Sequence, residues 1–267
     1  MEDFGRAVNL AREAGFDCVE IHAGHGYLIS QFLSPYTNHR HDEFGGSLDN
    51  RMRFMRLVIN KVMEAAADDL AVVVKMNMHD GFKKGMQTEE CIEVAKELER
   101  LGVHALVLSA GFVSKAPMEV MRGAMPLKTL AHYMDIRKFW WLKAGLALGG
   151  RLMIPTVPYS EGYFLEEAKK FRAAVSLPLI YVGGLISRSK MEEVLAAGFQ
   201  GLQMARALVH DTEFVNKLHS GELECSGCKH SNYCIGRMYT LEMKCHHCVD
   251  NLPEKLKEEI DKAEAEL

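Results

Sequence analysis

One joint, repeated three times, constrains the fold of this chain more than any other feature of its sequence. A helical pattern ends in Ala-Gly or Leu-Gly at Gly15, Gly102 and Gly198, and a short apolar run follows each glycine at once. Glycine adopts the left-handed turn that ends a helix and returns the chain to a sheet. The repeat therefore predicts helices that alternate with parallel strands.

Two further strands are predicted between these joints. Residues 70–74 form a β-branched run that is apolar on both faces, and residues 179–182 follow the turn-marking Pro178. Both patterns are typical of strands in a covered parallel sheet. The chain then has about five parallel strands. No G-x-G-x-x-G turn follows any of them, so we expect a βα (TIM) barrel rather than an open dinucleotide-binding sheet.

The helices between the strands have recognisable starts. Ser47 and Thr88 each stand just before a helical pattern, and Ser189 with Glu192 has the spacing of a capping box. Residues 112–168 are too many for an ordinary βα loop and too apolar for a linker. We therefore expect a folded excursion over the barrel mouth.

The composition excludes several classes of function. With 267 residues, 48% of them hydrophobic, the chain can bury a core, and its formal charge of −4 gives no field that would attract nucleic acid or an anionic membrane. No segment approaches the ~18 uninterrupted apolar residues of a membrane span, and residues 1–4 lack the features of a signal peptide. We expect a cytoplasmic protein whose partner is a small-molecule substrate, with no nucleic acid and no membrane as partner.

Functional groups of parallel βα folds gather where strands end, and the first such place holds two imidazoles and a phenol. His22, His25 and Tyr27 fall within six positions with small residues between them, so they can converge on one pocket as hydrogen-bond donors and a proton source. Each can equally be a packing residue. Lys75 closes a run of valines, where an ammonium needs water, an anion or a path to the rim.

The last two strand ends have the pattern of a phosphate site. Gly183 and Gly184 expose backbone N–H groups, and Arg206 adds a planar cationic fork suited to phosphate. Phosphate sites built from the loops after the final strands recur in βα barrels. Together with Lys75, this pattern predicts a phosphorylated cofactor across the barrel mouth.

A long segment around the two histidines carries a family resemblance. The sequence closely resembles the signature of the old yellow enzyme family, the NADH:flavin oxidoreductases, which include 2,4-dienoyl-CoA reductase-like proteins. The match is reinforced by Gly183-Gly184 and by Met-Ala-Arg-Ala-Leu at 204–208, and its main part runs from residue 15 to residue 35 as GFDCVEIHAGHGYLISQFLSP, continuing to Arg51.

This resemblance implies an FMN-dependent barrel in which NADH or NADPH reduces the flavin and an activated C=C bond is then reduced. Carried over by position, His22 and His25 hold the acceptor oxygen, and Tyr27 donates the proton. Hydrogen bonds at a carbonyl stabilise enolate-like charge, and hydride addition needs an acid on the other face.

The resemblance also implies residues for the cofactor. Lys75 corresponds to a basic residue near the flavin pyrimidine. Gly183, Gly184, Ala205 and Arg206 correspond to the residues that hold the FMN phosphate. Ala205 replaces a usual glycine but keeps its backbone N–H.

Family members carry roughly three more βα units before the histidine strand. We therefore expect a chain cut short at its N-terminus, with only about the last five βα units of the barrel, or with a complementary chain that supplies the missing strands. The predicted organisation is a partial FMN-binding barrel over 1–220, with its excursion at 112–168, and a Cys-rich segment with a C-terminal helix over 221–267.

Five cysteines crowd into the last segment. Some relatives bind an iron–sulfur cluster after the barrel through closely spaced cysteines, and one register here uses Cys228, Cys234 and Cys245 with Ser231 where another thiolate belongs. A second register uses Cys225 and Cys228. The pairs Cys225-x-x-Cys228 and Cys245-x-x-Cys248 have the spacing of a zinc ribbon. A segment that binds no metal is the third interpretation.

Two other functions stay open from the sequence alone. The same barrel accommodates a lyase or aldolase that uses Lys75 as a Schiff-base amine and the Gly183 and Arg206 loops for substrate phosphate. The chain could also be an inactive metal-binding fragment.

Overall fold

The structure is a computed structural model that describes residues 1–133, 141, 144–145, 149–150, 154–238 and 242–265. The chain divides into two compact units. The first comprises residues 1–120, 164–183 and 194–203, and the second comprises residues 121–163, 184–193 and 204–267. This division places residues 121–163 of the predicted excursion and the Cys-rich segment in one unit, and the predicted boundary at residue 220 stays a prediction.

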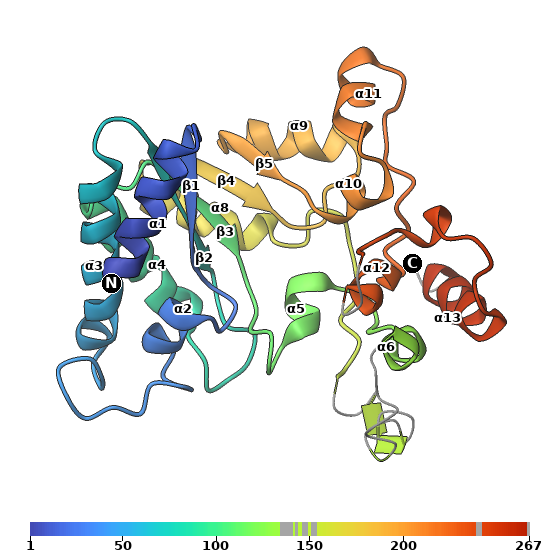
Figure 1. Cartoon of the computed structure of the whole chain (residues 1–267), viewed down its shortest axis with the longest axis horizontal. Helices are drawn as coiled ribbons and strands as arrows, with labels where there is room; N and C mark the ends of the chain where they lie inside the picture. The colour runs from blue at the N-terminus through green and yellow to red at the C-terminus, as the bar shows by residue number, and fades with distance from the viewer. Residues whose placement is uncertain (134–140, 142–143, 146–148, 151–153, 239–241, 266–267) are drawn as a thin grey trace. The chain divides into compact units, whose positions relative to one another are not determined.

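A parallel sheet forms the centre of the first unit, with the strand order β1-β2-β3-β4-β5 (Figure 1). Every neighbouring pair is parallel, so the predicted set of five parallel strands is confirmed. The strands are β1 (Cys18–Ala23), β2 (Ala71–Asn77), β3 (Ala105–Ser109), β4 (Leu179–Val182) and β5 (Gly201–Gln203).

The two faces of this sheet differ in burial. Val72, Val74 and Met76 of β2 are buried almost completely, whereas the alternate residues Val73 and Lys75 are only half-buried. Side chains alternate between faces along a strand, so one face packs into the apolar core and the other carries the polar groups. The helices of this unit are α1 (Glu2–Glu13), α2 (Leu28–Leu33), α3 (Leu48–Ala66), α4 (Thr88–Arg100), α5 (Pro117–Met121) and α8 (Leu165–Ala174), of which α5 ends one residue beyond the unit.

The sheet curves toward closure. Gln203 of β5 donates a hydrogen bond from Nε2 to Glu20 Oε2 of β1 at 3.0 Å, although these two strands are the opposite edges of the sheet. A flat sheet would hold its edge strands far apart, since neighbouring strands lie about 4.8 Å from each other. The curvature is that of a barrel segment, and the predicted partial barrel is confirmed.

The three predicted joints have the expected backbone. Gly15, Gly102 and Gly198 adopt φ values of 82°, 80° and 95°, which is the left-handed region that a side chain disfavours. Each glycine follows a helix and precedes the next strand. Ser47 is also confirmed as a helix cap, because its hydroxyl accepts a hydrogen bond from the backbone N–H of Asn50.

Two predicted helix starts are wrong. Thr88 is the first residue of α4 rather than its cap, and its hydroxyl donates to Glu167 Oε1 at 2.7 Å. Ser189 lies inside α9 (Arg188–Ala196). The first turn of α9 is capped instead by Ser187, whose hydroxyl accepts from the N–H of Lys190 at 3.3 Å.

The second unit is built from short helices. A small apolar core joins Tyr233 of α12 to Leu256 and Ile260 of α13. The predicted excursion contains α6 in this unit, while much of its middle lies outside the described residues. No helix in the described part of the chain is long and apolar enough to cross a membrane. The helical segments of this unit are α6 (Leu127–Tyr133), α10 (Arg206–His210), α11 (Phe214–Ser220), α12 (Tyr233–Arg237), η2 (His246–Cys248) and α13 (Glu254–Ala265), and α9 is shared with the first unit.

Candidate active site

The predicted histidine segment forms a tight turn at the end of β1. His22 lies within β1, which continues to Ala23, and the chain then turns through His25 and Gly26 at φ 58° and 82°. A Cβ on Gly26 would lie 2.4 Å from the Phe112 ring, so only glycine fits there. The turn delivers Tyr27 to the N-cap of α2.

This turn brings the three predicted catalytic side chains together. The ring centroid of His22 lies 5.0 Å from that of His25 and 5.0 Å from that of Tyr27. Tyr27 is 53% exposed, so a small molecule can reach it from solvent. The structure thus assembles two imidazoles and a phenol from one short segment.

His25 is held by groups from two neighbouring strands. Its Nε2 lies 2.8 Å from Ser109 Oγ at the end of β3, and its backbone N–H donates to Asn77 Oδ1 at the end of β2. Asn77 and Ser109 are paired in the sheet register. Because Nε2 is engaged by Ser109, Nδ1 is the nitrogen of His25 left for another partner.

His22 has an unsatisfied polar atom. Its Nδ1 is buried and has no hydrogen-bond partner among the residues that the structure describes. Leaving a buried donor or acceptor unpaired costs about 1–3 kcal/mol, so such an atom marks a place where a ligand group completes the bonding.

Burial keeps both imidazoles neutral. Desolvation, helped by His22 and Lys75, lowers the pKa of His25 to about 4. Desolvation and the charge of Lys75 also lower the pKa of His22, against the opposing charge of Glu20. At neutral pH each ring therefore has one N–H donor and one acceptor nitrogen.

Lys75 has a partner that sequence analysis did not identify. It was predicted to follow its strand, but β2 continues to Asn77, and Lys75 Nζ lies 2.8 Å from Glu20 Oε1. The Lys75 side chain is 20% exposed and that of Glu20 is 34% exposed. Lys75 pairs with His22 in the register of β1 and β2, so a cation stands beside the imidazole cluster. Alternation along β1 could have signalled Glu20, two positions before His22.

A buried carboxylate, that of Asp80, holds the turn in place through Asn77. Asp80 is 1% exposed, and its Oδ2 accepts hydrogen bonds from the Ser34 hydroxyl at 2.6 Å and the Met86 N–H at 2.8 Å. Its Oδ1 accepts from Asn77 Nδ2 at 2.9 Å. Asp80 therefore fixes the amide that holds the backbone of His25. Sequence analysis missed this residue, although an aspartate just after an apolar strand is a visible signal.

The lowered pKa of His25 predicts a pH-dependent stability. The unfolded chain has an ordinary histidine pKa of 6.5, and the folded protein has a His25 pKa of about 4, so unfolding between these values takes up a proton. The stability contributed by neutral His25 is complete above pH 6.5 and falls as the pH drops toward 4, by up to about 1.4 kcal/mol per pH unit.

Urea unfolding between pH 7 and pH 4 checks this expectation. His25→Gln should make the pH dependence shallower without abolishing it, because burial also lowers the pKa of His22 and His230, while His41→Gln, at an exposed position, should leave it unchanged. An equal slope in all three proteins would contradict a neutral, buried His25.

The predicted phosphate residues divide between the two units. Gly183 belongs to the first unit, and Gly184, Ala205 and Arg206 belong to the second. Gly184 has φ 69°, and a Cβ there would lie 2.6 Å from Tyr163 and 2.8 Å from Tyr159.

Within the second unit, a chain of contacts runs from Gly184 through Tyr159 and His230 to the neighbourhood of Arg206. The Tyr159 hydroxyl donates to the Gly184 carbonyl at 2.7 Å, and its ring stacks on His230 at 3.7 Å. Burial and the charge of Arg206 lower the pKa of His230 to about 3. Arg206 itself donates from Nη1 to Asn232 Oδ1 at 2.6 Å.

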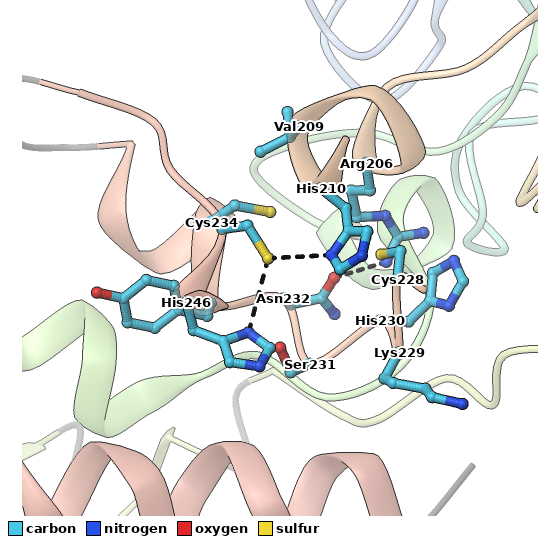
Figure 2. Close-up of a pocket in the computed structure, with 12 residues that line it drawn as sticks. Arg206, Val209, His210, Cys228, Lys229, His230, Ser231, Asn232, Cys234 and His246 are labelled. Atoms are coloured by element: carbon cyan, nitrogen blue, oxygen red, sulfur yellow. Dashed lines mark hydrogen bonds between the residues drawn. The ribbon is translucent and has the colours of Figure 1, made fainter. Parts of the chain in front are cut away.

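The Cys-rich segment of the second unit forms a pocket beside Arg206 (Figure 2). Cys228, Cys234 and Cys245 all line this pocket, together with His210, whose Nδ1 lies 3.4 Å from Cys245 Sγ. Figure 2 shows Cys228 and His210 turned toward the same space. Burial raises the pKa of Cys234 to about 11.

The two other cysteines of this segment do not line the pocket. Cys225 is exposed and forms an isolated antiparallel bridge with Ser187, and Cys248 is exposed at the end of η2. The structure therefore brings together the cysteines of the first predicted register and not those of the second. Ser231 also lines the pocket, at the position where the first register lacks a thiolate.

Comparison with known proteins decides the family. Residues 1–150 match the family described as NADH:flavin oxidoreductase / NADH oxidase. The chain belongs to this family. The NADH:flavin oxidoreductase resemblance predicted from the residues around His22 and His25 is thereby confirmed.

The similarity of this NADH:flavin oxidoreductase chain to curated relatives extends beyond residues 1–150. It is 38% identical over 242 residues to 4,4'-dithiodibutanoate disulfide reductase of Rhodococcus erythropolis, covering 90% of the chain and 59% of that relative. It is 31% identical over 250 residues to NADH oxidase of Thermoanaerobacter brockii, covering 92% of the chain and 33% of that relative. The chain thus spans little more than half of the first and a third of the second.

Solved structures show the same fold. 2-Naphthoyl-CoA reductase in complex with 2-naphthoyl-CoA matches 97% of the chain at a TM-score of 0.71 and 22% identity, over 34% of its own length. Histamine dehydrogenase from Rhizobium sp. 4-9 matches 90% of the chain at a TM-score of 0.65 and 24% identity, over 30% of its own length. At these identities the likeness concerns the fold alone.

Proposed function

We propose that the protein is an FMN-dependent oxidoreductase that uses NAD(P)H to reduce an activated C=C bond. The observation that carries this proposal is the unsatisfied Nδ1 of His22, buried beside Lys75 and within reach of Tyr27. A hydrogen-bond donor, a cation and a phenol at one strand end match the needs of conjugate reduction, which develops negative charge on an oxygen and consumes a proton.

The residues present fit FMN. In the proposal Lys75 stands beside the flavin ring, where its ammonium compensates negative charge, and Gly183, Gly184, Ala205 and Arg206 hold the phosphate through backbone N–H groups and a guanidinium. When bound, FMN supplies the hydride that NAD(P)H delivers to it. The partly buried position of Lys75 supports this assignment, because Glu20 is its single carboxylate partner among the described residues.

The two histidines orient the acceptor in this proposal. His22 Nδ1 and His25 Nδ1 bind the carbonyl or carboxylate oxygen of the substrate. Because both rings are neutral, they donate hydrogen bonds without repelling Lys75. Donors fixed before the reaction stabilise charge as it develops and lose little energy to reorganisation.

Tyr27 supplies the proton. Its exposed position at the start of α2 lets it meet the substrate and exchange its proton with water. The overall change adds a hydride to one carbon of the double bond and a proton to the other, while NAD(P)H becomes NAD(P)⁺.

In this proposal Glu20 partly compensates the positive charge of Lys75 near the flavin. Its carboxylate holds Lys75 at 2.8 Å, so Glu20→Gln should leave an uncompensated positive charge near the flavin and raise its midpoint potential. Lys75→Met should lower the potential. Each shift should be on the order of 30 mV, equivalent to about 1.4 kcal/mol for a two-electron couple. Potentiometric titration measures both, and shifts of the same sign would contradict the assignment.

A disulfide is the second acceptor class to consider. The 38% identical relative is named a disulfide reductase, and its match covers most of this chain. Reduction of a disulfide by NAD(P)H and a proton yields two thiols and NAD(P)⁺, which needs the same reductant and a proton donor at the same place.

The structure gives less support to a Schiff-base aldolase. Amines used for that chemistry are activated by desolvation or by a neighbouring cation, whereas Lys75 faces the carboxylate of Glu20. Borohydride trapping of a carbonyl substrate on Lys75 would be the result that favours the aldolase.

The cysteine pocket supports an iron–sulfur cluster held by Cys228, Cys234 and Cys245, with His210 or Ser231 near the fourth position. A closed zinc site has Zn–S distances near 2.3 Å, which places its sulfurs about 3.8 Å apart. Among the described residues, the group of potential ligands within 4.8 Å of one another contains no cysteine, so at least one pair of these three sulfurs is spaced more widely than a closed zinc site requires. Iron and acid-labile sulfide should disappear in Cys245→Ser.

We also propose the cytoplasm as the compartment and a small molecule as the partner. An eight-stranded barrel needs three strands more than the described sheet has, and a complementary chain that supplies them stays a proposal.

Steady-state assays with two acceptors test the function. An α,β-unsaturated ketone and a linear dialkyl disulfide should be compared with NADH and with NADPH. Turnover of the ketone supports the ene-reductase, and turnover of the disulfide alone would replace it by the second acceptor class. His22→Ala should lower kcat/KM for the preferred acceptor by about 10²-fold, since one preorganised donor is worth that much.

A further inference from the structure

We propose that His246, His247 and Glu264 form a binding site for a divalent transition metal, with Zn²⁺ as its natural occupant. The two histidines stand side by side in η2, and Glu264 lies near the end of α13. One donor atom from each residue lies within 4.8 Å of the others. This set contains no cysteine, although His246 also lines the cysteine pocket, and neither the flavin nor the NAD(P)H chemistry uses it.

The spacing of the donor atoms already approaches that of a metal site. Zinc binds imidazole nitrogen and carboxylate oxygen at 2.0–2.2 Å in a tetrahedron, so its ligand atoms stand about 3.4 Å apart. His246 Nε2 and Glu264 Oε1 are separated by 3.3 Å. The rings of His246 and His247 lie 4.0 Å apart with a tilt of 37°. Small rotations of these side chains bring the third donor to the same distance.

A second observation points to a cation at this place. Glu264 Oε1 is buried and, within the described residues, makes an ion-pair contact with His246 Nε2 at 3.3 Å but no hydrogen bond. A carboxylate oxygen taken from water without a donor is costly, and a metal ion satisfies it while supplying the opposite charge. The orphaned oxygen is the one that faces His246 Nε2.

The two ring nitrogens of His246 face different groups. Nδ1 lies 3.9 Å from Cys245 Sγ at the cysteine pocket, and Nε2 faces Glu264. A metal at Nε2 therefore leaves the other nitrogen directed at Cys245. Metal-binding imidazoles commonly use their second nitrogen in such an outer contact, which fixes the ring orientation.

The donor set selects the class of metal. Two imidazoles and one carboxylate suit zinc and its neighbours Co²⁺ and Ni²⁺, whereas Ca²⁺ and Mg²⁺ prefer oxygen ligands throughout. Three protein ligands leave a fourth position for water. The site would tie the end of α13 to η2, whereas the contacts of α13 with the rest of this unit lie nearer its start and middle, at Leu256 and Ile260 in the apolar core and at Glu259, which accepts hydrogen bonds from α6. Metal binding to the folded protein alone then adds to its stability.

Zinc titration of the purified, chelator-treated protein tests the site, with a competing indicator to report affinity. His247→Ala and Glu264→Gln should each weaken Zn²⁺ binding by at least about 100-fold, because loss of a ligand exceeds the 10–100-fold cost of losing an outer contact. Glu258→Gln on the exposed side of α13 and His219→Ala on α11 are matched controls and should bind as the unchanged protein does. His247 is exposed, so its replacement leaves the packing intact.

Co²⁺ substitution identifies the donors directly. The spectrum of the cobalt protein should show ligand-field bands without a thiolate charge-transfer band, and Cys228→Ser should leave it unchanged. A thiolate band, or Zn²⁺ binding that survives in both ligand variants and is lost in Cys228→Ser, would overturn the proposal and assign the metal to the cysteines.

Discussion

Tyr27→Phe is expected to slow reduction of an activated alkene by about 10²- to 10⁴-fold, the usual contribution of a positioned general acid. Reduction of the bound flavin by NAD(P)H should keep its rate, because that half-reaction needs no proton from the phenol. Tyr27 lies with its ring centroid 5.0 Å from that of His22 and is exposed, so removing its hydroxyl changes the chemistry with little effect on packing. Anaerobic stopped-flow measurements separate the two half-reactions.

Tyr36→Phe is the matched control for this experiment. Tyr36 lies in the same segment and packs edge-on against Phe82 and Phe112, and we assign it no part in the reaction. Its replacement should change neither rate. Equal losses in both half-reactions of Tyr27→Phe would show that the phenol positions a ligand and does not donate the proton.

Asp80→Ala is expected to destabilise the protein by about 3 kcal/mol or more. The change removes the buried acceptor of the Ser34 hydroxyl and of the Met86 N–H, and one of the two acceptors of the Asn77 amide. Hydrogen bonds to charged groups contribute about 1.5–3 kcal/mol each, and an unpaired buried donor adds its own penalty. Urea unfolding at pH 7 measures the loss.

Two further variants sharpen this test. Asp80→Asn keeps the shape and one acceptor, so it should cost less than the alanine. Asp68→Ala removes an exposed aspartate and should shift the stability by less than about 0.5 kcal/mol. A small effect of Asp80→Ala would mean that water replaces the carboxylate. Asp80 would then not be the residue that fixes Asn77 and, through it, the backbone of His25.

Most of the sheet could be predicted because its signals are local. Gly15, Gly102 and Gly198 end helices through a backbone conformation that depends on glycine itself, and their φ values follow. The helix starts at Thr88 and Ser189 could not be predicted in this way. The hydroxyl of Thr88 bonds Glu167, 79 positions away in the chain, and tertiary contacts of this kind override a local capping preference.

In the candidate site, too, the local groups could be predicted and the contacts between distant segments could not. His22, His25 and Tyr27 could be predicted as a group because one short segment carries all three. The pairing of Glu20 with Lys75 depends on the register between β1 and β2, which no local pattern specifies. Register also decides the contact of His25 with Ser109. The cysteine spacing allowed two registers, and only the position of Cys225 outside the pocket distinguishes them.

The central claim, a flavin held beside Lys75 and reduced by NAD(P)H, is tested most directly by the visible spectrum of the purified protein under anaerobic conditions. The account predicts flavin absorbance that corresponds to one FMN per chain and is bleached by a slight excess of NADH or NADPH, with FMN retention lowered in Lys75→Met. Protein that binds no FMN when reconstituted with it, or bound FMN that neither nucleotide bleaches, would contradict the account.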